Sequence, residues 1–206
     1  MMAERRDSYA AALSAVRRMA REGRFAWGDP IVIKSLAAEL RLSSTPVREA
    51  LACISGLGLI EHRQGHGYFF PALSAADIID LFDLEWTYVH AALTLHDRGA
   101  ATLQRGLSSA MPLATVQALF AAVVGHTGNE ALGASHRTAL ERLAPVYRVI
   151  DSLGTGDATA VEAVSIAGGR GGREALLRAI EAHHKARCAL AGEVARILRR
   201  QSDRQI

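Results

Sequence analysis

Apolar residues recur at helical spacing through the first third of the chain. Between residues 6 and 21 they stand at positions 9, 13, 16 and 20, which predicts an amphipathic helix. A second helix is predicted over residues 34–41, and residues 42–44 form a sharp turn. A third helix opens on Pro46, where a missing N–H costs nothing. One face of this third helix buries four residues at the spacing i, i+3, i+4 and i+7: Val47, Ala50, Leu51 and Ile54.

Strand-like patterns flank this pair of helices. Ile60–Arg63 and Tyr68–Pro71 are predicted to form a hairpin closed by Gln64–Gly67. Residues 31–33 are predicted to form a further short strand. Two short helices joined by a sharp turn and followed by a hairpin make a winged helix-turn-helix, whose second helix fits the major groove of DNA.

The rest of the chain is predicted to be helical, with no strand after residue 71. Ser74 and Asp77 form a capping box that opens a helix ending near residue 96. Its predicted buried residues are Ile78, Leu81, Phe82, Leu84 and Val89. Glycine and proline breakers separate further helices at about residues 99–109, 112–125, 129–153, 157–168 and 171–200.

The predicted fold class is therefore mainly α, with two domains. Residues 1–71 form a winged helix-turn-helix domain with a small β-hairpin wing. Residues 72–206 form an all-helical bundle that serves effector binding or dimerisation.

Composition agrees with a helical globular protein and excludes other classes. Half of the chain is hydrophobic but only 5% is aromatic, and the Ala and Leu that make up the difference favour helices. No run of 18 apolar residues could span a membrane, and the charged N-terminus lacks the apolar segment of a signal peptide. We therefore expect a cytoplasmic protein in which Cys53 and Cys188 are buried thiols rather than a disulfide.

Positive charge is concentrated at the N-terminal end. Residues 1–73 carry ten Lys and Arg against seven Asp and Glu, whereas the remaining residues carry fourteen of each. The net charge of +3 thus lies in the predicted winged domain. This excess is small, so DNA affinity would depend on a few well-placed arginines and not on bulk charge.

The polar face of the third helix carries the candidate for base recognition. Thr45, Arg48 and Ala52 point away from its apolar face, and Arg48 lies in the first turn. An arginine there can pair with guanine O6 and N7 through two hydrogen bonds. The alternative is a solvated arginine that pairs with Glu49 or Glu61.

Other residues of the domain are candidates for contacts with the DNA backbone or the minor groove. Ser44 and Thr45 can donate to phosphates or cap the helix, and Lys34 can reach a phosphate. His66 and Gly67 either enter the minor groove or form a plain hairpin turn. The candidate DNA-binding residues are Lys34, Ser44, Thr45, Pro46, Arg48, His66 and Gly67.

The stretch LAAELRLSSTPVREALACISGLGLIEHRQGHGYFF, residues 36–70, resembles the winged helix-turn-helix of the GntR family of bacterial transcription regulators. The TPVREAL segment is the most specific part, and the resemblance covers about residues 9–71. It implies a DNA-binding regulator. The family has Arg where this chain has Ser44, which removes one phosphate or base contact.

The helical remainder is similar, more loosely, to the C-terminal (FCD) domain of the fatty-acid-regulator branch of that family. Many members of that branch bind a metal through one Asp and three His. The resemblance puts these ligands at Gln117, Ala121, Arg173 and Ala195. Alanine has no donor and arginine is a permanent cation, so we predict no metal site and no cofactor. The effector-facing Arg of the branch falls at Glu85, and the candidate ligand-binding residues are Glu85, Gln117 and Arg173.

The sequence therefore favours a homodimeric, sequence-specific transcription regulator, a repressor of operator DNA that a small molecule modulates. Homodimerisation is expected because one recognition helix offers too few base contacts for genomic specificity. The alternative is an effector-independent DNA-binding or protein-interaction module whose ligand site has been lost. No enzyme is predicted, because the chain has no Gly-x-Ser-x-Gly, His-Glu-x-x-His, Cys-x-x-Cys or phosphate-loop motif.

Overall fold

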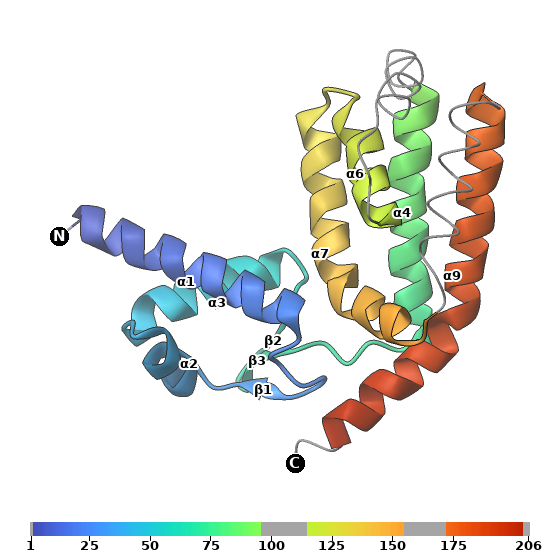
Figure 1. Cartoon of the computed structure of the whole chain (residues 1–206). Helices are drawn as coiled ribbons and strands as arrows, with labels where there is room; N and C mark the ends of the chain where they lie inside the picture. The colour runs from blue at the N-terminus through green and yellow to red at the C-terminus, as the bar shows by residue number, and fades with distance from the viewer. Residues whose placement is uncertain (1, 96–114, 155–171, 204–206) are drawn as a thin grey trace. The chain divides into compact units, whose positions relative to one another are not determined.

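The computed structural model describes residues 2–95, 115–154 and 172–203, and the helices predicted at 99–109 and 157–168 lie outside them. The chain divides into two compact units, Met1–Leu73 with Ala195–Ile206, and Ser74–Val194. Both are mostly helical (Figure 1), so the predicted fold class is confirmed. Among the described residues, no helix combines the length and apolar character that a membrane span needs.

The first unit combines helices with a small antiparallel sheet. Its helices are α1 (Met2–Glu22), α2 (Ile33–Leu40) and α3 (Ser44–Gly56), and it also includes the end of α9 (Gly172–Asp203) from Ala195 onward. Its strands are β1 (Pro30–Ile31), β2 (Glu61–Arg63) and β3 (Gly67–Phe69), in the order β1-β3-β2. Tyr68 of the central strand lies opposite Ile31 on one side and His62 on the other. The predicted hairpin is therefore correct. The short strand predicted at residues 31–33 lies at Pro30–Ile31 instead, because α2 begins at Ile33, and its pairing with β3 was not predicted.

The core of this unit forms between α1 and α3. All four apolar residues predicted to face inward from α3 have no exposed surface: Val47, Ala50, Leu51 and Ile54. They pack with Ala12 and Val16 of α1, which are also fully buried. Because burial of these side chains fixes the rotation of α3, it also fixes which residues of this helix face solvent.

A left-handed residue makes the turn between α2 and α3 tight. Arg41 ends α2 with φ 53°, and it is the only non-glycine residue with positive φ in the described part of the chain. The amide of Leu42 then donates to the carbonyl of Ala37 at 2.9 Å, a bond typical of a Schellman cap. Ser43 follows in extended conformation as the N-cap, and α3 begins at Ser44, two residues earlier than predicted.

The second unit contains α4 (Ala75–Leu95), α6 (Val116–Gly125), α7 (Glu130–Ser152) and the part of α9 (Gly172–Asp203) before Ala195. These helices lie side by side (Figure 1) around an apolar core. Phe82 packs on Tyr147 and Tyr88 on His136, so α4 and α7 run antiparallel. Of the residues predicted to be buried on α4, only Leu84 is wrong, because it is half-buried.

The predicted capping box at the start of α4 is confirmed. The Ser74 amide donates to the Asp77 carboxylate at 2.8 Å, and the Asp77 amide donates to the Ser74 hydroxyl at 3.2 Å. The hydrogen bonds from Ser74 hold the pKa of Asp77 below its usual value. The carboxylate is therefore charged at neutral pH, next to the positive end of the helix dipole.

We expect Asp77→Ala to lower the free energy of unfolding by about 1 kcal/mol, because it removes one half of the capping box. Asp80→Ala is the matched control, since Asp80 is exposed one turn further along α4. That control should change stability by less than about 0.5 kcal/mol. Urea unfolding of the full chain at neutral pH measures both, and equal losses would contradict the role of the cap.

Candidate nucleic-acid interface

One face of α3 is free of the core and carries the predicted recognition residues. Thr45, Arg48 and Ala52 are all exposed, as the helical periodicity predicted. Glu49 and Cys53 lie on the flank of α3 toward α1, where both raise the pKa of Tyr9, Cys53 most strongly through a side-chain hydrogen bond. The face with Thr45, Arg48 and Ala52 is therefore directed away from α1.

The Arg48 guanidinium is exposed and is available for contact with DNA. Its side chain makes no hydrogen bond or ion pair with any residue that the structure describes. Glu61, one of its two predicted alternative partners, instead accepts from Arg63, with N–O distances of 2.8 and 3.1 Å. Because α3 begins at Ser44, Arg48 is the fifth residue of the helix and lies just beyond the predicted first turn. An exposed guanidinium near the N-terminus of a helix can still reach a guanine edge without first breaking an internal ion pair.

The hydroxyls beside Arg48 are not used as helix caps. Ser43 occupies the N-cap position, and its side chain accepts no capping hydrogen bond. Ser44 and Thr45 follow it in the first turn and are exposed. A capping role for these two residues is therefore wrong, whereas donation to a phosphate at the N-terminus of α3 remains our prediction. Pro46 is buried, so it can serve an interface only by shaping the first turn.

The other predicted contacts lie on neighbouring elements. Lys34 is exposed at the second residue of α2, the first helix of the pair. His66 is exposed in the turn between β2 and β3, where its Nδ1 lies 3.0 Å from the Gln64 carbonyl oxygen. Gly67 has φ 93°, a conformation that side chains rarely adopt, so the turn itself requires this glycine.

Arg63 is a wing residue that the sequence did not single out. Its guanidinium carbon lies 4.1 Å from the centre of the Phe69 ring on the neighbouring strand. Together with the ion pair to Glu61, this contact fixes the side chain along the wing. The local sequence offered a signal, because Arg63 is the last charged residue before the turn that closes the hairpin.

The cysteines differ from the prediction. Both thiols are free, but Cys53 is exposed and Cys188 is half-buried. Cys53 follows Ala52 on the polar side of α3, and the apolar spacing of that helix ends at Ile54. Burial of the apolar face fixes the rotation of α3, and this rotation leaves Cys53 exposed although cysteine is most often buried.

The candidate ligand residues of the second unit occupy three different helices. Glu85 of α4 is buried, with 4% of its surface exposed, and its carboxylate accepts a hydrogen bond from the Tyr147 hydroxyl of α7. Gln117 is half-buried in the first turn of α6, and Arg173 is half-buried at the start of α9. The structure thus gives Glu85 an internal hydrogen-bond donor.

The residues at the ligand positions implied by the fatty-acid-regulator branch do not fit a metal. Ala121 and Ala195 have no donor atom, and the Arg173 guanidinium repels a cation. Gln117 alone offers a neutral oxygen. No chemistry that depends on that metal can be assigned to these positions.

Comparison with known proteins agrees with this geometry. Residues 8–70 match the family model described as bacterial regulatory proteins, gntR family. These residues cover α2, α3 and the sheet, so the first unit contains a DNA-binding domain of the GntR type. No curated protein matches the sequence of the chain.

Solved structures share the fold over most of the chain. A transcriptional regulator GntR from Rhodococcus sp. RHA1 has a TM-score of 0.70 at 16% identity, and the alignment covers 89% of this chain and 96% of that one. McbR/YncC of E. coli has a TM-score of 0.63 at 15% identity, with 90% and 97% covered. Lar of Listeria monocytogenes has a TM-score of 0.52 at 11% identity, with 89% and 95% covered. At these identities the likeness shows a common fold.

Proposed function

We propose that this chain, whose residues 8–70 form a DNA-binding domain of the GntR type, is a sequence-specific transcription regulator. In the proposed complex α3 lies in the major groove. Arg48 reads a guanine, while Ser44, Thr45 and Lys34 contact phosphates and the turn at His66 and Gly67 approaches the minor groove. The observation that carries the proposal is the exposed Arg48, held on a helix whose opposite face is fully buried.

We further propose that the regulator is a homodimer, and in its simplest form a repressor. One domain offers one guanine-reading arginine, which separates a correct base from a wrong one by about 1–3 kcal/mol. Two copies related by a twofold axis double this discrimination and require an operator with inverted symmetry. A dimer bound to such an operator blocks access to the DNA beneath it. This function places the protein in the cytoplasm, together with the DNA.

The mode of regulation has two candidates. In the first, a small molecule binds the second unit near Glu85, Gln117 and Arg173 and shifts the population of DNA-competent dimers. In the second, the protein responds to no small molecule. The hydrogen bond between Glu85 and Tyr147 favours the second candidate, because Glu85 already has a donor inside the unit.

Selection of DNA from a random double-stranded pool by the purified full chain tests the proposal. We expect an enriched inverted repeat, and fluorescence anisotropy should show that an excess of scrambled duplex does not displace it. Affinity should fall as the salt concentration rises from about 50 to about 200 mM, because phosphate contacts release counterions. Enrichment of a single half-site would contradict the dimer. A pool that yields no preferred sequence would overturn sequence-specific recognition.

A further inference from the structure

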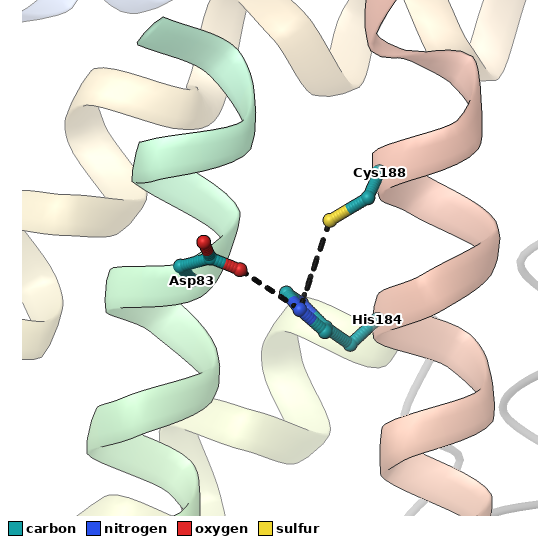
Figure 2. Close-up of side chains that lie close together, drawn as sticks. All are labelled: Asp83, His184 and Cys188. Atoms are coloured by element: carbon teal, nitrogen blue, oxygen red, sulfur yellow. Dashed lines mark hydrogen bonds and ion pairs between the residues drawn. The ribbon is translucent and has the colours of Figure 1, made fainter. Parts of the chain in front are cut away.

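Three side chains with different metal-binding atoms meet on the surface of the second unit. Asp83 comes from α4, while His184 and Cys188 stand one turn apart on α9 (Figure 2). A carboxylate oxygen, an imidazole nitrogen and the thiol sulfur all lie within 4.8 Å of one another. No other group of three such side chains lies this close within the described residues.

The contacts in this cluster centre on the His184 imidazole. Asp83 Oδ1 lies 3.0 Å from His184 Nε2, and Cys188 Sγ lies 3.7 Å from Nε2 and 3.9 Å from Nδ1. A tetrahedral zinc ion with bonds of about 2.0–2.3 Å separates nitrogen, oxygen and sulfur ligands by roughly 3.4–3.6 Å. The nitrogen–oxygen and nitrogen–sulfur separations are therefore close to those around one ion, and rotation of the exposed Asp83 side chain and the His184 ring would bring all three atoms to bonding distance.

The placement of the sulfur distinguishes the cluster from a nucleophilic triad. In a triad the carboxylate and the nucleophile contact opposite nitrogens of the histidine. Here the carboxylate contacts Nε2, and the sulfur lies 3.7 Å from Nε2 and 3.9 Å from Nδ1, so the sulfur is not placed on the opposite nitrogen. Burial, followed by the negative charge of Asp83, raises the pKa of the Cys188 thiol, so the thiol is protonated at neutral pH and is a poor nucleophile.

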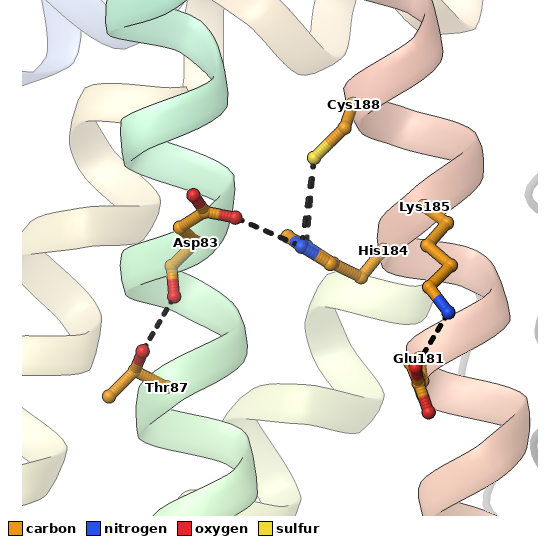
Figure 3. A network of polar contacts seen from close by, with 6 residues as sticks. All are labelled: Asp83, Thr87, Glu181, His184, Lys185 and Cys188. Carbon is orange, nitrogen blue, oxygen red and sulfur yellow. Dashed lines mark hydrogen bonds and ion pairs between the residues drawn. The ribbon is translucent and has the colours of Figure 1, made fainter.

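Neighbouring residues hold the cluster in place and leave it accessible. The Trp86 ring stacks on the His184 imidazole, with centroids 5.9 Å apart and planes 20° apart. The Lys185 ammonium is bound to Glu181 at 2.7 Å and points away from the cluster (Figure 3). The Asp83 side chain is 57% exposed and that of His184 is 17% exposed, so an ion can enter from solvent.

We propose that Asp83, His184 and Cys188 form a site for a divalent transition metal of the zinc class. The sulfur and imidazole donors select against magnesium and calcium, which prefer oxygen ligands. Binding forms one bond to each of the three side chains, displaces water from the hydrated ion and releases the thiol proton to solvent. Three protein ligands leave a fourth position for water or a small anion. This site departs from the prediction of no metal and uses none of the positions implied by the fatty-acid-regulator branch.

Titration of the full chain with Zn²⁺ and Co²⁺ tests the site. In a Trp27→Phe background Trp86 is the only tryptophan, and its stacking on His184 makes it a local reporter. We expect Co²⁺ to quench Trp86 fluorescence with one ion per chain and to give the near-ultraviolet absorption of a cobalt–thiolate bond. Zn²⁺ should displace Co²⁺, whereas the same concentration of Mg²⁺ should cause no change.

Matched variants identify the ligands. Cys188→Ser should remove the thiolate absorption, and Asp83→Asn should weaken Co²⁺ binding by at least about tenfold, because a neutral amide is a poorer ligand than a carboxylate. Cys53→Ser and Asp80→Asn exchange exposed residues outside the cluster and should bind as the parent does. Far-ultraviolet circular dichroism checks that every variant is folded. Absence of the thiolate band in the parent, or its persistence in Cys188→Ser, would overturn the proposal.

Discussion

Arg48→Ala is expected to abolish selective binding to the operator while the protein stays folded. The side chain is exposed and makes no hydrogen bond or ion pair with the described residues, so its removal breaks no internal polar contact. Each lost guanine contact costs about 1–3 kcal/mol, and a symmetric dimer loses two. Specific affinity should therefore fall by at least about tenfold, whereas the weaker binding to scrambled DNA changes little. Anisotropy titrations with the selected operator and a scrambled duplex measure both.

Arg178→Ala is the matched control for this variant. Arg178 is also an exposed helical arginine, but it lies on α9 and pairs with Glu174. Its loss removes one positive charge, as Arg48→Ala does, so a general effect of charge would weaken operator binding equally in both variants. If Arg48→Ala keeps the parental affinity for the operator, the assignment of α3 as the recognition helix is wrong.

The winged domain could be predicted from sequence because its signals are local. The apolar spacing on α3 predicted both the buried residues and the exposed face with Arg48. The hairpin followed from two short strands and the glycines between them. By contrast, the pairing of β1 with β3 joins Ile31 to Tyr68, and no local pattern specifies a contact over that distance in sequence. The left-handed Arg41 could not be predicted either, because the residue is not a glycine.

The second unit was less predictable because its polar residues are placed by tertiary packing. The capping box at Ser74 and the helix that it opens could be predicted, because both depend on residues that are neighbours in sequence. Burial of Glu85 depends on Tyr147, a residue on another helix. The cluster that we propose as a metal site has one local signal, the spacing of His184 and Cys188 on one helix face. Asp83 joins them only because α4 packs beside α9.

His136 gives a second large expected effect, a loss of stability in mild acid. The imidazole is 1% exposed, and its Nε2 has no hydrogen-bond partner in the described part of the chain. Burial, followed by the charge of Arg137, lowers the pKa of His136 from 6.5 to about 4. The unfolded chain takes up a proton below about pH 6.5, whereas the folded chain does not until about pH 4. Neutral His136 therefore does not lower the free energy of unfolding above about pH 6.5. That free energy falls progressively as the pH drops from about 6.5 toward 4, because only the unfolded chain is then protonated.

Comparison of His136→Leu with the parent isolates this contribution. Between about pH 7.5 and about pH 4.5 the parent should lose roughly 2–3 kcal/mol through this residue. His136→Leu should lack that loss, because leucine occupies the buried position next to Tyr88 and binds no proton. His90→Leu, an exposed position on α4, leaves His136 in place and should retain the full acid sensitivity. Urea unfolding at both pH values gives the difference between the variants. Parallel losses in His136→Leu and the parent would show that protonation of His136 does not destabilise the fold.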